Sequence, residues 1–73
     1  MYNDTFEIEN CKIMCSNKEE TSFLVQSSFF VRDPTYQTWI PEYAIHDDSP
    51  IWQVGEEGTL IVKSNFAIDR GWL

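Results

Sequence analysis

The chain has 73 residues, with 12 Asp and Glu against 5 Lys and Arg, and its formal net charge is −7. A chain this short has room for one domain, which we expect to span residues 1–73, and it buries only about 60% of the surface that its unfolded form exposes. Binding to nucleic acid depends on neutralising phosphates with Lys and Arg, so this charge disfavours nucleic acid and anionic lipid as partners. The hydrophobic fraction of 42% argues against disorder.

The N-terminal segment indicates where the protein works. Residues 1–9 are polar and acidic, and they lack the basic and apolar regions of a secretory signal. No apolar run reaches the length that a membrane-spanning helix needs. We therefore expect a cytoplasmic protein without membrane contact, in which Cys11 and Cys15, the only cysteines, stay reduced.

Alternating apolar and polar residues predict a strand over 5–15, and the alternation changes phase inside it. The apolar residues are even-numbered at first, at Phe6 and Ile8. They are then odd-numbered, at Cys11, Ile13 and Cys15. Because side chains of a strand alternate between its faces, this slip requires a bulge or a bend, which we place near Asn10. The same spacing places both thiols on one face of the strand.

The middle of the chain alternates between turn signals and β-prone runs. Pro41 stops the last of these runs, and residues 42–45 form either a short strand or a single helical turn. In chain order the predicted elements are a polar loop over 16–21, a strand over 22–31, a turn at Asp33-Pro34, a strand over 36–40 and a turn-rich segment over 46–50.

The C-terminal third predicts a hairpin and a helix. Residues 51–54 and 59–62 flank a four-residue loop with a glycine at each end, which is typical of a hairpin. Ser64 or Asn65 caps a short helix that Gly71 ends.

We expect Trp72 and Leu73 then to pack back over the open end of a barrel. Together the elements predict a mainly β fold, a small SH3-like or OB-like barrel of four to five strands with a short C-terminal helix.

The second half of the chain, from Trp39 to Leu73, resembles a group of short proteins encoded by bacteriophages and prophages. Several elements keep their order and spacing, which makes the resemblance moderately specific. They are Trp39-Ile40-Pro41, Ile45, Asp47-Asp48-Ser49, Gly55 to Gly58, Thr59-Leu60-Ile61-Val62, and Phe66-Ala67 through Gly71.

The chain departs from this pattern at two positions. Glu42 stands where the group has a basic residue, and Asn65 stands where it has Trp. We expect both positions to be exposed, which makes it doubtful that a binding surface is shared with the group. The resemblance implies a phage or prophage origin, hence the cytoplasm of a bacterial host cell, and a small β-fold, and it implies no activity.

The sequence gives little support to catalytic or metal sites. His46 is the only histidine, and it lies in an Asp-rich turn far from Cys11 and Cys15 along the chain. No nucleophile elbow, phosphate-binding loop or zinc-hydrolase motif is present. Structural zinc takes four ligands from paired motifs, and a single pair, the two cysteines, exists here. We therefore predict no enzyme activity, no metal and no cofactor.

Three acidic doublets lie in predicted turns: Glu19-Glu20, Asp47-Asp48 and Glu56-Glu57. If these turns converge on one side, their carboxylates resemble the phosphates of DNA and dock into a basic groove. The alternative is that the turns carry charge because loops are solvated. Calcium binding is disfavoured because the spacing of an EF-hand loop is absent.

Four aromatic residues, Tyr36, Trp39, Tyr43 and Trp52, have two interpretations. They can form a base-stacking platform, but such platforms work together with a positive groove. We expect most of these rings in the core, with one or two exposed as contacts for a protein partner.

The leading hypothesis is a small acidic protein-binding module of a phage or mobile element. It would bind a protein with a basic surface and inhibit a host defence or nucleic-acid enzyme stoichiometrically, as an anti-CRISPR protein or DNA mimic does. The alternatives are a single-stranded nucleic-acid-binding OB-like domain and a phage accessory protein that assembles with itself as a homo-oligomer. The expected binding residues are Glu19, Glu20, Tyr36, Trp39, Asp47, Asp48, Trp52, Glu56 and Glu57.

Overall fold

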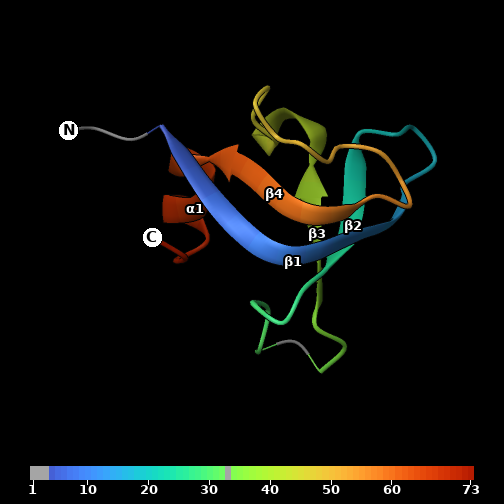
Figure 1. The fold of residues 1–73 in the computed structure, drawn as a ribbon, viewed down its shortest axis with the longest axis horizontal. Helices are drawn as coiled ribbons and strands as arrows, with labels where there is room; N and C mark the ends of the chain where they lie inside the picture. The colour runs from blue at the N-terminus through green and yellow to red at the C-terminus, as the bar shows by residue number, and fades with distance from the viewer. Residues whose placement is uncertain (1–3, 33) are drawn as a thin grey trace.

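The computed structural model describes residues 4–32 and 34–73, and it confirms a mainly β fold with a short C-terminal helix (Figure 1). No helix in this described part is long and apolar enough to cross a membrane. In chain order the elements are β1 (Thr5–Ser16), β2 (Ser22–Gln26), β3 (Gln37–Pro41), the 3-10 helix η1 (Glu42–Ala44), β4 (Glu57–Lys63) and α1 (Ser64–Asp69).

The four strands form one open antiparallel sheet in the order β3-β2-β1-β4. β1 is long enough to pair with β4 over most of its length and with β2 over its last residues. Figure 1 shows β1 as a long curved strand with β4 beside it, while β2 and β3 run at a steep angle to both. An isolated bridge between Ile45 and Val62 brings the segment after η1 to β4.

A bulge in β1 explains the change of phase in the sequence. The pairing with β4 passes from Ile8–Leu60 to Cys11–Gly58, so β1 has one more residue than β4 between these two pairs. Asn10, within the bulge, has a φ of 57°, in the left-handed region. The extra residue lets both Ile8 and Cys11 face the core, where they are buried. The irregularity predicted near Asn10 is confirmed.

A second irregularity in β1 separates the two cysteines. The register of β1 against β2 shifts between Ile13 and Cys15, so Met14 is an extra residue. As a result Cys11 is buried and Cys15 is exposed. The prediction that both thiols share one face is wrong, because this extra residue turns the strand between them.

β2 ends at Gln26, well short of the predicted end at Val31. Ser27 ends it: the Ser27 hydroxyl donates to the carbonyl of Glu9 at 2.8 Å and accepts the N–H of Phe29 at 3.2 Å. The backbone N–H of Ser27 makes the last bond to the β3 side, and beyond it these side-chain bonds turn the chain away from the sheet. Val31 is therefore exposed, and the predicted strand is wrong beyond Gln26.

The predicted hairpin between 51–54 and 59–62 is also wrong. β4 pairs with β1, and residues 51–54 form no strand. The N–H of Gly55 donates to the carbonyl of Ile13 at 2.8 Å, and the N–H of Ile13 donates to the carbonyl of Glu56 at 3.0 Å. The chain therefore already lies against β1 when it enters β4.

The boundaries of β3 follow from its end residues. Tyr36 has a φ of 56°, so the strand begins after it, at Gln37. Pro41, predicted to stop the strand after residue 40, is its last residue, and of the two alternatives for the next residues the structure shows the helical turn. The turn predicted at Asp33-Pro34 includes Asp33, which lies outside the described residues.

The end of α1 returns Trp72 to the core, as the sequence predicts. Gly71 has a φ of 77°, and the N–H of Trp72 donates to the carbonyl of Ala67 at 2.9 Å, as in a Schellman motif. The ring of Trp72 lies 5.5 Å from that of Phe30. Leu73 differs from its prediction, since 64% of it is exposed.

The Ser27 hydroxyl donates to the backbone at the bulge in β1, so we expect its removal to destabilise the protein. Ser27→Ala should lower the free energy of unfolding by about 1–2 kcal/mol, because it removes the buried hydroxyl that donates to the partly buried carbonyl of Glu9. Ser28→Ala is the matched control, since Ser28 is exposed. Urea unfolding measures both variants, and equal losses would contradict this role of Ser27.

Candidate functional site

An open groove of about 930 Å³ lies where the β1–β2 loop, η1 and the segment before β4 meet. We call it the acidic groove, because four acidic residues line it and no Lys or Arg does among the described residues. Two partly buried apolar side chains, Phe23 and Ile45, also line it. The acidic residues are Glu19, Glu20, Glu42 and Asp47.

Asn17 fixes the loop that carries the first two carboxylates. Its Oδ1 accepts the N–H of Thr21 at 2.7 Å and that of Ser22 at 3.0 Å. Glu20 adopts a φ of 59°, which turns the chain back towards β2. The loop therefore has a defined shape that holds Glu19 and Glu20 at the groove.

Hydrogen bonds to β4 fix the opposite wall. The N–H of His46 donates to the carbonyl of Ile61 at 2.8 Å. The buried hydroxyl of Ser49 accepts the N–H of Ile61 at 3.1 Å and donates to the carbonyl of Ile51 at 2.7 Å. Asp47 lies between these two anchors, exposed and lining the groove.

Glu56 positions the tryptophan of the groove. Its Oε1 accepts the N–H of Trp52 at 2.9 Å and that of Gln53 at 2.7 Å, which closes the turn before β4. This turn presents Trp52, 57% exposed, at the groove. One oxygen of the Glu56 carboxylate is thus bonded to the backbone, and Glu56 does not line the groove.

The three acidic doublets meet only in part. Glu19-Glu20 and Asp47 line the acidic groove, whereas Asp48 does not. The N–H of Asp48 donates to Nδ1 of His46 at 3.0 Å, and its carboxylate, on a side chain that is 80% exposed, lies 3.7 Å from the same nitrogen. Glu57 lines a second pocket and pairs in register with Lys12 of β1.

The structure adds Glu42 to the acidic residues that the sequence singled out. It follows Pro41, opens η1 and lines the groove. Sequence reasoning missed it because it belongs to no doublet. Its one signal in the sequence was that it stands where the pattern considered in the sequence analysis would have a basic residue.

The four aromatic residues Tyr36, Trp39, Tyr43 and Trp52 are all exposed, with exposed fractions from 46% to 73%. The expectation that most lie in the core is wrong, because aliphatic side chains such as Ile40 fill the interior. Tyr36 lines the second pocket and Trp52 the acidic groove, so these two rings serve different surfaces.

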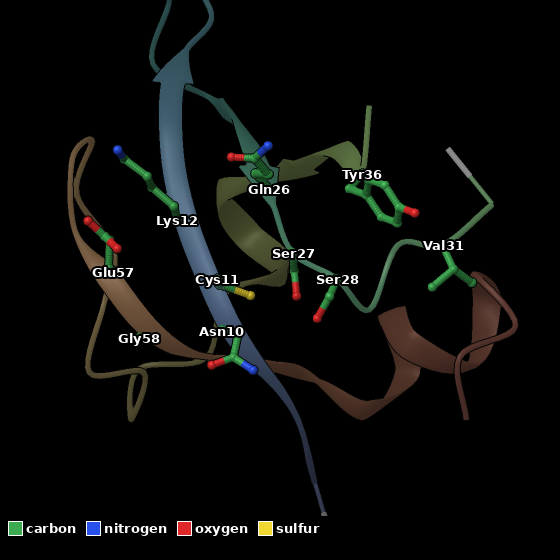
Figure 2. A pocket seen from close by; sticks show the side chains of 10 residues that line it. All are labelled: Asn10, Cys11, Lys12, Gln26, Ser27, Ser28, Val31, Tyr36, Glu57 and Gly58. Carbon is green, nitrogen blue, oxygen red and sulfur yellow. The ribbon is translucent and has the colours of Figure 1, made fainter. Parts of the chain in front are cut away.

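The second pocket, of about 990 Å³, lies beside the bulge of β1 (Figure 2). Figure 2 shows Cys11 pointing from β1 towards Ser27, with Tyr36 on the far side. Burial raises the pKa of the Cys11 thiol above its ordinary value. A neutral, buried thiol is the opposite of an activated nucleophile. His46 lines the acidic groove instead, so the two residues of a Cys–His pair lie in different pockets.

Within residues 4–32 and 34–73, no group of three or more His, Cys, Asp or Glu side chains is arranged to hold a metal ion. Comparisons with protein-family models, with curated protein sequences and with solved structures give no match for this chain.

The burial of Cys11 predicts unequal thiol reactivity. At pH 8 a thiol reagent should modify Cys15 at least about 100-fold faster than Cys11, which reacts only when the sheet opens. In denaturant both thiols should react at one rate. Equal rates in the folded protein would contradict the burial of Cys11.

The raised pKa of Cys11 also predicts a dependence of stability on pH. The free energy of unfolding should fall as pH rises above about 8.5, since the unfolded thiol releases its proton more readily than the folded one.

The two bonds of Glu56 predict a cost that its neighbour does not share. Glu56→Ala should lower the free energy of unfolding by about 1–2 kcal/mol, because two backbone donors lose a charged acceptor. Glu57→Ala should cost at most about 1 kcal/mol, the value of an exposed cross-strand charge pair. Thermal unfolding measures both, and a larger loss for Glu57→Ala would reverse the assignment.

Proposed function

We propose that this chain is an acidic interaction module that binds a protein with a basic surface and acts by occupying that surface, without catalysis. The observation that carries the proposal is the acidic groove. It gathers four acidic residues around an exposed tryptophan, and no Lys or Arg of the described residues lines it.

The lining of the groove fits an arginine or lysine side chain. The face of Trp52 attracts a cation, and the surrounding carboxylates accept its hydrogen bonds. Phe23 and Ile45 provide apolar surface for the aliphatic stem of such a side chain. Arginine is the better ligand of the two, because its planar guanidinium both stacks on an aromatic ring and pairs with a carboxylate through two bonds.

The charge of the whole chain supports the same class of partner. A net charge of −7 steers a basic surface towards the groove and repels nucleic acid. The partner we propose is a host defence or nucleic-acid enzyme whose basic surface normally holds nucleic acid, in line with the phage proteins that the chain resembles. Glu42 adds a carboxylate where those proteins have a basic residue.

The scaffold in this proposal is a small barrel of SH3-like or OB-like type. The bridge between Ile45 and Val62 supports it, because it brings the segment after η1 to β4, across the open side of the sheet. The same bridge holds the wall of the groove that contains Asp47.

An affinity experiment in bacterial lysate tests the proposal with three baits: the wild-type chain, Glu19→Lys/Asp47→Lys in the groove, and Glu7→Lys/Asp69→Lys outside it. Both variants change the net charge equally, and all four positions are exposed. We expect the wild-type and control baits to retain one protein partner near stoichiometry after nuclease treatment. The groove variant should retain at least about tenfold less, because close charge pairs are lost.

Two results would contradict the proposal. Equal loss with both variants would mean that net charge, and not the groove, drives capture. Loss of the partner on nuclease treatment would favour the alternative of a single-stranded nucleic-acid-binding domain. The exposed rings of Trp39 and Trp52 are of the kind on which bases stack. In that case an oligonucleotide should quench tryptophan fluorescence at low salt.

A further inference from the structure

Hydrogen bonds at both ends of the β2–β3 pair fix which backbone groups of β3 face outward. The N–H of Ser27 donates to the carbonyl of Tyr36 at 2.9 Å, and the N–H of Glu42 donates to the carbonyl of Thr21 at 2.8 Å. In an antiparallel pair the residues that exchange hydrogen bonds alternate along each strand. The even-numbered residues from 36 to 42 therefore direct their N–H and C=O groups towards β2.

The odd-numbered residues of β3 direct their backbone groups the other way. Because β3 is an edge strand, Gln37 and Trp39 present N–H and C=O groups away from the sheet, and Pro41 presents a carbonyl. The carbonyl of Trp39 accepts a long bond, 3.4 Å, from Nη2 of Arg70. β3 itself contains no charged residue, so Arg70, whose guanidinium also lies 4.7 Å from the centre of the Phe66 ring, is the charged side chain that contacts this edge.

A cleft of about 360 Å³ borders the beginning of this edge, between Gln37-Thr38 and the C-terminal residues 70–72. Two of the five Lys and Arg residues of the chain, Arg32 and Arg70, line it, and no Asp or Glu among the described residues does. No described carboxylate lies within ion-pair distance of either arginine. In a chain of net charge −7 this cleft is locally basic.

We propose that the edge of β3 accepts an extended strand of a partner protein, and that an Asp or Glu side chain of that strand meets Arg32 and Arg70 in the cleft. Strand addition displaces the long bond of Arg70 from the carbonyl of Trp39, and it uses the outward backbone groups of Gln37 and Trp39 for affinity and the two arginines for charge selection. This inference is independent of the acidic groove, which lies beyond the other end of β3, after Pro41.

Amide hydrogen exchange, measured by NMR on the whole chain, tests this directly. The probe is a peptide with capped ends and the sequence Thr-Val-Asp-Val-Thr-Val. In the free protein the amides of Thr38 and Ile40 should exchange slowly, and those of Gln37 and Trp39 quickly. Saturating peptide should slow exchange at Gln37 and Trp39 at least about tenfold.

Two control peptides separate the contributions. Replacing Asp by Lys in the peptide should weaken binding about tenfold, since a charge-assisted pair is lost. N-methylation of alternate peptide amides should abolish binding, because the ladder cannot form.

A pair of variants separates the backbone from the indole side chain. Trp39→Pro removes one outward N–H and leaves the bonds to β2 in place, whereas Trp39→Val keeps the N–H and loses the same indole. We expect Trp39→Pro to bind the peptide about tenfold more weakly than Trp39→Val, with melting temperatures showing that both fold.

Three results would overturn the inference: no binding of the Asp peptide, unchanged affinity after N-methylation, or binding without slower exchange at Gln37 and Trp39. Slower exchange that grows with protein concentration in the absence of peptide would overturn the choice of partner and assign the edge to a second copy of the chain.

Discussion

The bulge of β1 is the constraint on which the rest of the structure depends. The Ser27 hydroxyl holds the carbonyl of Glu9 while Asn10 takes the left-handed conformation, so the central strand bends there. The bend lets one strand pair with β4 and with β2 while both Ile8 and Cys11 remain in the core. At this bend the two halves of the sheet run at a steep angle to each other (Figure 1). The position where the loops meet follows from this angle.

The parts of the fold that the sequence could predict are those set by burial. The phase change near Asn10 is visible because a one-residue slip moves every later side chain to the other face. The wrong predictions concern which segments of the chain pair with each other. The pairing of β4 with β1 involves a hydrogen bond of Gly55 to Ile13, far apart in the sequence, and the end of β2 depends on a hydroxyl group that bonds to β1 where the ladder stops. The exposed aromatic rings were misplaced because nothing local shows that aliphatic residues already fill the core.

The candidate site could be predicted in part for the same reason. Doublets of acidic residues identify the charged turns, and Glu19-Glu20 and Asp47 do line one groove. Whether turns converge depends on long-range contacts, here the bridge of Ile45 to Val62 and the bonds of Ser49 to β4. The structural role of Glu56 also appears only once its carboxylate is seen to accept two backbone N–H groups.

An NMR titration with a short arginine-containing peptide measures whether the acidic groove binds a basic side chain of a protein. A peptide with citrulline in place of arginine has nearly the same shape and no charge. We expect the arginine peptide to shift the indole N–H of Trp52 and the backbone amides of Ile45 and Asp47, and the citrulline peptide to leave them unchanged. Equal shifts with both peptides, or shifts that avoid the groove, would contradict this expectation.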